Sequence, residues 1–262
     1  MEVNNEKIRS PLSSWMGGKY LLSRTIVPLI PEHQCYAEPF AGAAWVLFRK
    51  PPSKCEILND INRDVVNIYR VVQHHWEAFA NALQWSLSSR EEFDRLLDMP
   101  AESMTDIQRA ARYYYLHRLC FGGRVAGRRS FAISATSPTS FNPMTLRREM
   151  EMTHRRLARV TIEHLPYAEL IRIYDRAGTF FYIDPPYWDC EQYYGKGIFD
   201  KRDFAKLADQ LAGIKGMFLL SLNDTPEVRD IFGGFHIEGA TVRYSCTTAA
   251  HPLAKEVLIR NY

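Results

Sequence analysis

The sequence predicts an α/β protein in which an inserted, mostly helical domain interrupts a Rossmann-like sheet. Near both ends of the chain, short apolar segments that end in turns alternate with amphipathic segments, as in parallel sheets covered by helices. Between residues 74 and 158 this alternation stops and helical periodicity takes over. We therefore divide the 262 residues into a first sheet part (1–73), an insert (74–158) and a second sheet part (159–262).

The composition excludes several classes of protein. With 46% hydrophobic and 24% charged residues, the chain resembles ordinary soluble globular proteins, and no apolar segment is long enough to cross a membrane. The first ten residues carry four charges and no apolar region, so we expect no signal peptide. The five cysteines include no Cys-x-x-Cys pair and the histidines no metal-ligand spacing, which predicts reduced thiols in a cytoplasmic protein without a metal site.

A loop at residues 11–20 precedes the first predicted helix, residues 20–29. Gly17-Gly18-Lys19 matches half of a P-loop, but Tyr20 stands where that motif needs a Ser or Thr hydroxyl and the earlier glycine is absent. A nucleoside triphosphatase is therefore excluded. Trp15 beside a lysine on a loop suggests ligand contact, and core packing of Trp15 is the alternative.

The next segment has the order of a nucleotide-binding βα unit. A strand at residues 34–38 breaks into the small-residue turn 39–44, where Gly42 permits close approach to the backbone, and a helix follows at 45–49. A second strand, residues 56–60, ends in Asp60, 18 positions after Gly42. This is near the spacing of about 20 residues typical of a ribose-binding carboxylate. An N-cap role for Asp60 in the helix 65–73 remains open.

The insert has a strong basic bias. We predict helices at residues 74–87, 90–97, 105–120 and 146–157, and a hairpin or ordered loop around Gly127. Residues 109–159 contain eleven arginines, no lysine and two glutamates, which is a net +9; since the whole chain is +3, the remainder is −6. Arginine suits phosphates and base edges, so this segment indicates nucleic-acid binding. A solvated helix face is the alternative for residues 147–159.

After the insert the alternation of strands and helices resumes. The predicted strands are residues 160–163, 180–184 and 217–222, with a closing pair at 235–244 and 256–261. The predicted helices are residues 168–175, 204–212 and 227–231.

The strand at residues 180–184 runs into Asp184-Pro185-Pro186-Tyr187. Two prolines supply no N–H to a sheet and fix the turn, and ligands of open α/β sheets bind at this carboxyl edge. These four residues suit the transfer of a chemical group to an exocyclic amine on a flat ring. Asp184 and the Pro185 carbonyl can accept the two amine N–H groups, and Tyr187 can stack on the ring. The alternative is a cap and a packing residue at an ordinary strand end.

With these motifs in order, the sequence resembles the Dam-type DNA adenine-N6 methyltransferases over most of its length. The motifs are Trp15-Met16-Gly17-Gly18-Lys19-Tyr20, Glu38-Pro39-Phe40-Ala41-Gly42-Ala43, Asn59-Asp60-Ile61-Asn62, Asp184-Pro185-Pro186-Tyr187 and Ser221-Leu222-Asn223-Asp224. The target-recognition insert lies between the third and the fourth.

The resemblance implies an S-adenosylmethionine-dependent enzyme on a Rossmann-like methyltransferase sheet with an antiparallel hairpin near its end. It implies that Asp60 takes the ribose hydroxyls, and that Asp184 lies between cofactor and target amine. The implied cofactor-binding residues are Trp15, Lys19, Glu38, Phe40, Gly42, Asp60 and Asp184, and the catalytic ones are Asp184, Pro185, Pro186 and Tyr187.

The implied substrate is double-stranded DNA, from which the target base must be flipped out. The candidate DNA-binding residues are Arg118, Arg124, Arg128 and Arg129. The resemblance implies neither metal nor membrane, and we expect a monomer in a bacterial or phage-infected cell.

Three departures from the family pattern stand out. Ala44 occupies the second glycine position of F-x-G-x-G, which is acceptable if its φ is negative. His117-Arg118 replaces an Asn-Arg pair, and residues 121–131 differ from the enzymes that read GATC, so we do not expect GATC as the target. Cytosine-N4 methylation, and a DNA-binding protein that has lost catalysis, remain alternatives.

Overall fold

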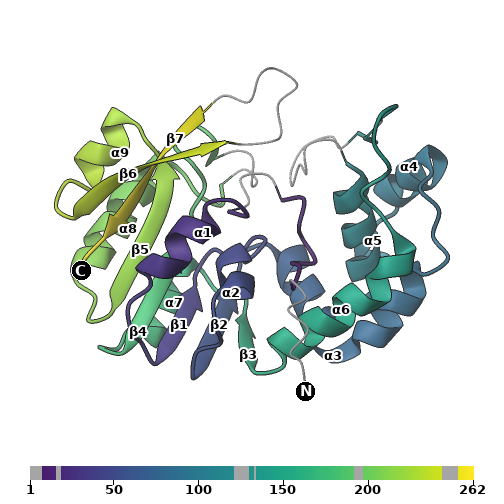
Figure 1. Cartoon of the computed structure of the whole chain (residues 1–262), viewed down its shortest axis with the longest axis horizontal. Helices are drawn as coiled ribbons and strands as arrows, with labels where there is room; N and C mark the ends of the chain where they lie inside the picture. Colours follow the sequence, from purple (N-terminus) through teal and green to yellow (C-terminus); the bar gives the residue numbers. More distant parts are fainter. Residues whose placement is uncertain (1–7, 16–18, 121–129, 133, 192–196, 244–252) are drawn as a thin grey trace.

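A computed structural model describes residues 8–15, 19–120, 130–132, 134–191, 197–243 and 253–262. Within these residues seven strands form one sheet in the order β3-β2-β1-β4-β5-β7-β6 (Figure 1). Strands β1 to β5 pair in parallel, whereas β7 pairs antiparallel with both β5 and β6. The predicted α/β class and the closing antiparallel hairpin are therefore confirmed.

The strands lie within a few residues of their predicted positions. Their bounds are β1 Cys35–Glu38, β2 Cys55–Asn59, β3 Val160–Glu163, β4 Thr179–Ile183, β5 Met217–Asn223, β6 His236–Arg243 and β7 Leu253–Arg260. The strand order reverses between β1 and β4, and such a switch point opens a ligand crevice at the carboxyl edge of a sheet.

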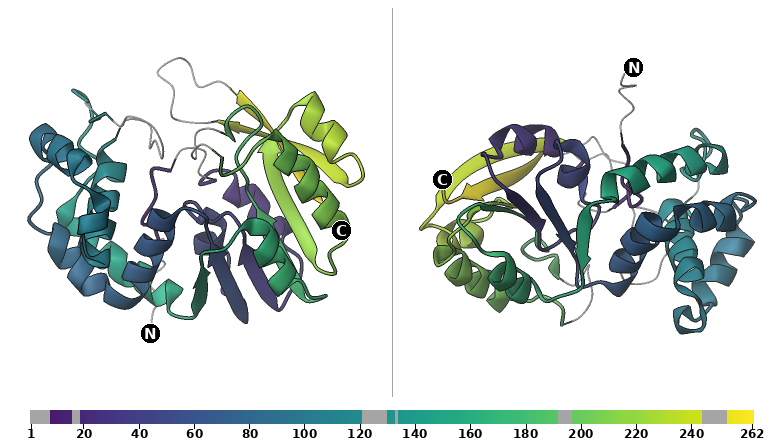
Figure 2. Two further views of the ribbon diagram at one scale, coloured as in Figure 1. Left: turned by 180° about the vertical axis from the view of Figure 1, so that it is seen from behind. Right: turned by 90° about the horizontal axis from the view of Figure 1, so that it is seen from below.

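Helices cover both faces of the sheet (Figure 2). On one face, Tyr36 and Tyr182 pack in a core with α1 (Ser23–Ile26), η1 (Val27–Leu29), α2 (Trp45–Arg49) and the first half of α3. On the other face, Phe181 and Ile183 pack against α7 (Tyr167–Tyr174), α8 (Lys201–Ala212) and α9 (Pro226–Ile231). Because β4 is apolar on both faces, it forms the centre of the fold.

The insert is helical and lies beyond the β3 edge of the sheet (Figures 1 and 2). It contains α4 (Arg90–Asp98), η2 (Ala101–Ser103), α5 (Asp106–Leu119), α6 (Pro143–Leu157) and the second half of α3 (Arg63–Leu83). The two helices predicted at 65–73 and 74–87 are one helix, α3, with a kink at His75 (φ −135°, ψ 32°). The predicted boundary between residues 73 and 74 falls beside this kink.

Side-chain caps explain where two helices begin. Thr105 and Gln108 form a capping box at the start of α5, as the predicted start at residue 105 requires. Asp200 and Asp203 form a second box, so α8 begins at Lys201, three residues earlier than the apolar periodicity predicts. The cap satisfies backbone N–H groups that would otherwise lack partners, and this extends the helix beyond its apolar face.

A buried ionic cluster fastens the insert to the sheet. Glu56 at the start of β2 accepts from Lys50 Nζ at 2.5 Å and from Arg156 Nη2 of α6 at 2.8 Å. Arg156 Nη2 also donates to the carbonyl of Leu47 in α2 at 2.8 Å. The three charged side chains are 3–5% exposed, and burial of that degree is tolerated because each charge is paired.

Among the described helices, none is long and apolar enough to cross a membrane.

Candidate functional site

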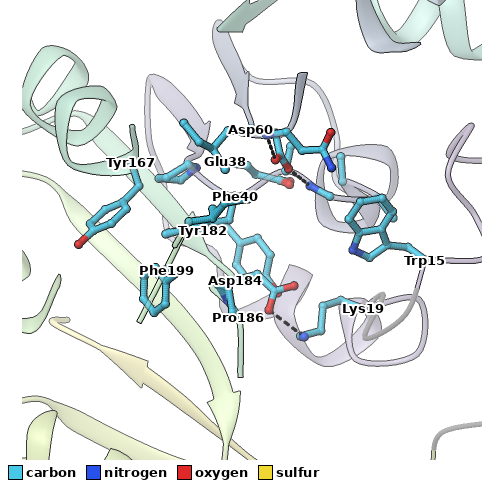
Figure 3. Close-up of a pocket in the computed structure, with 18 of the residues that line it drawn as sticks. Trp15, Lys19, Glu38, Phe40, Asp60, Tyr167, Tyr182, Asp184, Pro186 and Phe199 are labelled. Carbon is cyan, nitrogen blue, oxygen red and sulfur yellow. Dashed lines mark hydrogen bonds and ion pairs between the residues drawn. The ribbon is translucent and has the colours of Figure 1, made fainter. Parts of the chain in front are cut away.

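A pocket opens at the carboxyl edge of the sheet, beside the switch point between β1 and β4 (Figure 3). Its walls come from the N-terminal loop, the turn after β1, the loops after β2 and β3, and the segments that follow β4. Eight predicted site residues line it: Trp15, Lys19, Glu38, Phe40, Gly42, Asp60, Asp184 and Pro186. The fold thus brings together residues that are up to 171 positions apart in the sequence.

Asp60 joins two of these walls. Its Oδ2 accepts the backbone N–H of Gly42 at 2.9 Å, and its Oδ1 accepts that of Asn62 at 2.8 Å (Figure 3). Burial raises the pKa of the Asp60 carboxyl, and the two backbone donors oppose that rise. The N-cap interpretation of Asp60 is wrong, because Asn62 caps α3 through Asp64 N. Carboxylate oxygens have further lone pairs, so Asp60 can also accept ligand hydroxyls.

The turn after β1 is tight because an indole ring lies against it. Gly42 has φ +45°, and a Cβ there would lie 2.9 Å from Trp15 Nε1. Only glycine meets both conditions without strain. Trp15 is 9% exposed, lines the pocket and lies 5.7 Å from the His117 ring of α5. The two interpretations of Trp15, ligand contact and core packing, are therefore compatible.

Ala44 does not have the negative φ under which alanine fits its position. It adopts φ 50° and ψ 37°, in the left-handed region, directly before α2. For an alanine this conformation costs about 1–2 kcal/mol. Ala44 is 3% exposed, so the surrounding packing holds the strained turn in place.

An aromatic group forms the far wall of the pocket. The rings of Phe40 and Tyr167 stack 5.2 Å apart, and Phe199 packs edge-on to Phe40 at 5.9 Å. Tyr167 is the first residue of α7 and Phe199 lies between β4 and α8, and the sequence offers no local signal for their meeting with Phe40. Such a group suits a flat apolar ring.

Glu38 is a buried acid at the end of β1. Its Oε1 accepts from the Tyr36 hydroxyl at 2.6 Å and from Leu47 N at 2.9 Å. Burial raises the pKa of Glu38 to about 8, against the two hydrogen bonds, which lower it. Glu38 therefore fixes the start of α2 and presents an acid with a strongly raised pKa to the pocket.

Asp184 lies directly after β4 and is paired with Lys19. The Lys19 Nζ lies 2.8 Å from Asp184 Oδ1 (Figure 3). Lys19 Nζ also donates to the Tyr187 hydroxyl at 2.7 Å. Ser221 Oγ of β5 also donates to Asp184 Oδ1, at 3.2 Å. Burial raises the pKa of the Asp184 carboxyl, whereas Lys19 and Ser221 act to lower it. The Asp184 carboxyl group thus accepts hydrogen bonds from two side chains, Lys19 and Ser221. Its own side chain is 22% exposed.

The turn after Asp184 is held from β5. Asn223 Oδ1 accepts from Trp188 N at 2.9 Å, and Asn223 Nδ2 donates to Trp188 O at 3.1 Å. Pro186 lines the pocket, Pro185 is buried, and Tyr187 reaches Lys19 beside the pocket. Ser221 and Asn223 belong to a motif that carries the family resemblance, and their roles here were not predicted.

Several arginines of the basic segment have partners within the protein. Arg112 donates to the carbonyls of Leu96 and Leu97, and Arg109 lies 3.1 Å from Asp64. Together with the buried Arg156, these side chains hold the insert together, so the +9 charge overstates the surface available to nucleic acid.

Of the four predicted DNA-binding arginines, the structure describes one. Arg118 donates to Ser13 Oγ and to the Ser140 carbonyl, and its guanidinium lies 5.9 Å from the Tyr114 ring centroid. It therefore joins the insert to the N-terminal segment, and its contact with DNA stays a prediction. Arg124, Arg128 and Arg129, with the predicted hairpin around Gly127, lie outside the described residues.

No group of three or more His, Cys, Asp or Glu side chains suited to a metal ion occurs in the described part of the chain. The four cysteines in that part (Cys35, Cys55, Cys120 and Cys190) are free thiols.

Comparison with known proteins gives consistent matches. The model of the D12 class N6 adenine-specific DNA methyltransferases matches residues 15–246. A type II methyltransferase of Lactococcus lactis subsp. cremoris, M1.LlaDCHI, is 27% identical over all of this chain and 98% of its own length. A DNA adenine methylase of Vibrio cholerae is 26% identical, over 84% of this chain and 83% of the relative. The type II methyltransferase M.CviBI of Paramecium bursaria Chlorella virus NC1A is 22% identical, over 86% of this chain and 87% of the relative.

Proposed function

The chain belongs to the D12 class of N6 adenine-specific DNA methyltransferases, and from this we propose that Asp184 holds the adenine amine during transfer. Methylation of adenine N6 in DNA is the activity of the family. The observation that carries the proposal is the position of Asp184, at the carboxyl end of β4, within the pocket and 2.8 Å from Lys19.

Asp184 addresses the main difficulty of the reaction. The lone pair of the adenine amine is delocalised into the ring, so the amine is a weak nucleophile. A carboxylate that accepts one N–H, together with the Pro185 carbonyl on the other, favours a pyramidal amine whose lone pair is localised on nitrogen and directed at the electrophile. The carboxylate also stabilises the positive charge that develops on nitrogen. Lys19 favours the ionised form of Asp184, which this role requires.

The pocket residues fit S-adenosylmethionine, the methyl donor that the family implies. The rings of Phe40, Tyr167 and Phe199 suit its adenine. Asp60 suits the ribose hydroxyls, because its oxygens line the pocket and retain acceptor capacity. Glu38 suits the ammonium of its methionine part. When bound, S-adenosylmethionine would supply an electrophilic methyl group whose bonding electrons stay on its sulfur, and the methylated amine would then release one proton.

We assign duplex DNA as the substrate, with the target adenine flipped into the pocket and Tyr187 stacked on it. Arg124, Arg128 and Arg129 remain the leading candidates for phosphate and base contacts. The segment that contains them follows α5, whose His117 lies 5.7 Å from the pocket residue Trp15. This contact supports a recognition segment close to the reacting base.

The test is methyl transfer from labelled S-adenosylmethionine to unmethylated genomic DNA, followed by modified-base sequencing. We expect N6-methyladenine in one short sequence. Asp184→Ala should abolish transfer while the affinity for S-adenosylmethionine stays within about tenfold, because Asp60 and the aromatic wall remain. Full activity of Asp184→Ala would overturn the assigned role. N4-methylcytosine as the product would instead favour the cytosine alternative.

A further inference from the structure

Strand β5 carries a hydroxyl where its pattern calls for an apolar residue. Ser221 is 0% exposed and shares a face of the strand with Leu219, which packs in the same core as Tyr182. Its neighbour across the β5–β7 ladder, Leu258, packs in that core as well. A buried hydroxyl is costly unless it is hydrogen-bonded, so this position calls for partners on the remaining side, towards β4.

Two groups on the β4 side are these partners. Ser221 Oγ donates to Asp184 Oδ1 at 3.2 Å and lies 2.9 Å from the Tyr182 hydroxyl oxygen. The register explains both contacts, because Ile183 pairs with Leu220 in the parallel β4–β5 ladder. The next residues, Asp184 and Ser221, therefore lie beside each other. Tyr182 precedes Asp184 by two positions and so lies on the same face of the sheet.

The direction of donation follows from the donors available. An ionised carboxylate has only acceptors, so the single hydroxyl proton of Ser221 is directed to Asp184. The Tyr182 hydroxyl must then donate to Ser221 Oγ. Burial raises the pKa of Tyr182 above its ordinary value, so this hydroxyl keeps its proton at neutral pH. The order of donation is Tyr182 to Ser221 to Asp184.

Lys19 and Ser221 approach the same oxygen of Asp184. Lys19 Nζ lies 2.8 Å from Oδ1, and Ser221 Oγ lies 3.2 Å from it. Both side-chain donors that Asp184 has in the described part of the chain therefore lie on Oδ1. This arrangement leaves the lone pairs of Oδ2 for an N–H of the target amine.

We propose that Ser221 is a positioning residue for methyl transfer, which fixes the rotation of the Asp184 carboxylate so that Oδ2 accepts the target amine. The proposal rests on the proposed role of Asp184. Lys19 alone defines that rotation poorly, because an ammonium is a point charge with three equivalent donors on a flexible stem. Ser221 adds a second donor from a buried strand, and Tyr182 fixes the direction of its hydroxyl.

The test begins with Ser221→Ala, which removes one oxygen atom from the core. We expect kcat on genomic DNA to fall about tenfold or more, because misplacement of a reacting group by about 1 Å can cost about 100-fold. KM for DNA and Kd for S-adenosylmethionine should change less than about threefold, since Ser221 acts through Asp184 rather than on either ligand. Ser221→Cys keeps a weak donor of similar size, so its kcat should fall less than that of Ser221→Ala.

Two further readouts separate positioning from general stabilisation. The acidic limb of kcat against pH should move to higher pH in Ser221→Ala, because the Ser221 hydrogen bond acts to lower the pKa of Asp184. In the Ser221→Ala background, Tyr182→Phe should lower kcat no further, since the Tyr182 hydroxyl acts through Ser221.

A buried hydroxyl at the opposite end of β4 provides the matched control. Thr179 is 1% exposed, and its Oγ1 donates to the Tyr174 carbonyl at 2.8 Å. Thr179→Val also removes a buried hydroxyl that is hydrogen-bonded, but far along the strand from Asp184. It should leave both kcat and the acidic limb unchanged.

Three results would overturn the proposal. They are wild-type kcat in Ser221→Ala, an acidic limb that does not move in that variant, and additive losses of kcat with Tyr182→Phe. If Ser221→Ala does not fold, the double variant with Tyr182→Phe decides, because it removes both halves of the hydrogen bond and leaves no buried hydroxyl unpaired. Its kcat must then be about tenfold or more below wild type. Wild-type enzyme that transfers no methyl group to adenine would instead contradict the proposed function, so the two failures are distinguishable.

Discussion

The ammonium group of Lys19 lies 2.8 Å from the Asp184 carboxylate, with only 3% of the Lys19 side chain exposed. The resemblance implied that Lys19 contacts the cofactor, and this stays a prediction. The structure shows that Lys19 is the counter-charge of the proposed catalytic carboxylate, Asp184. The pKa of Asp184 is raised by burial and lowered by Lys19, so removal of Lys19 should be visible in the pH dependence of the reaction.

Lys19→Met should move the acidic limb of kcat against pH to higher pH. Without the ammonium, the effect of burial is opposed less, so the pKa of Asp184 rises further. Asp184 then becomes protonated at a higher pH than in the wild type. Each unit by which that pKa passes the assay pH lowers the ionised fraction about tenfold. Lys19→Arg is the control that retains the charge. Identical limbs in Lys19→Met and wild type would contradict this role.

Ala44→Gly should stabilise the protein by about 1 kcal/mol, because glycine adopts φ 50° without the strain that alanine carries. Urea unfolding of variant and wild type measures the difference. Ala43→Gly, one residue earlier and without a positive φ, should instead lower the free energy of unfolding by about 0.5–1 kcal/mol. Changes of the same sign in both variants would contradict the assignment of strain to Ala44.

Arg156→Ala should lower the free energy of unfolding by about 3 kcal/mol, because it removes one partner of the buried Glu56 carboxylate. The adjacent Arg155 provides a matched control on the same helix. Its pair with Glu151 is exposed, with 75% of the arginine side chain accessible, so Arg155→Ala should cost less than about 0.5 kcal/mol. Equal losses in urea unfolding would show that burial of the pair is unimportant.

Glu38 should make the protein less stable as the pH rises. Its pKa is about 8 in the folded protein against 4.5 as the ordinary value, so the folded state favours the neutral acid. This stability is fully present below about pH 4.5 and is lost as the pH rises to about 8. Between pH 5 and 8 the free energy of unfolding should change with pH less in Glu38→Gln than in the wild type, by about 1 kcal/mol or more. Glu77→Gln, with a side chain 64% exposed, should not.

Arg124→Ala and Arg128→Ala should weaken DNA binding or relax the methylated sequence. Loss of a phosphate contact makes the slope of log K for DNA binding against log salt concentration less steep by about 0.9. Loss of a base contact instead costs about 1–3 kcal/mol of discrimination at one position of the target. Salt-dependent binding and modified-base sequencing separate the two. Arg172→Ala on α7, where the side chain is 73% exposed, is the control. Unchanged binding and sequence preference would remove both arginines from the interface.

The basic segment shows why charge alone is a weak guide to a surface. The arginine count of residues 109–159 indicated nucleic acid, yet Arg109, Arg112 and Arg156 bind groups of the protein itself. Composition records how many charges a segment has. It does not record which of them face carbonyls or carboxylates on neighbouring helices, because those neighbours are set by how α3, α4 and α6 pack.

By itself the sequence determined the α/β class, the closing hairpin and the position of Asp184 at a strand end. These depend on local features: alternation of apolar segments, the turn chemistry of Pro185-Pro186, and the order of short motifs along the chain. Such features act within a few residues, so they can be identified without the partners in space.

Only the tertiary structure decided that Lys19 pairs with Asp184, and that Tyr167 and Phe199 complete the wall with Phe40. Each of these contacts joins segments far apart in the chain. They depend on the strand order β3-β2-β1-β4, which brings the segments after β1, β3 and β4 to the same edge of the sheet. No local periodicity contains that order, because it results from the packing of the whole sheet.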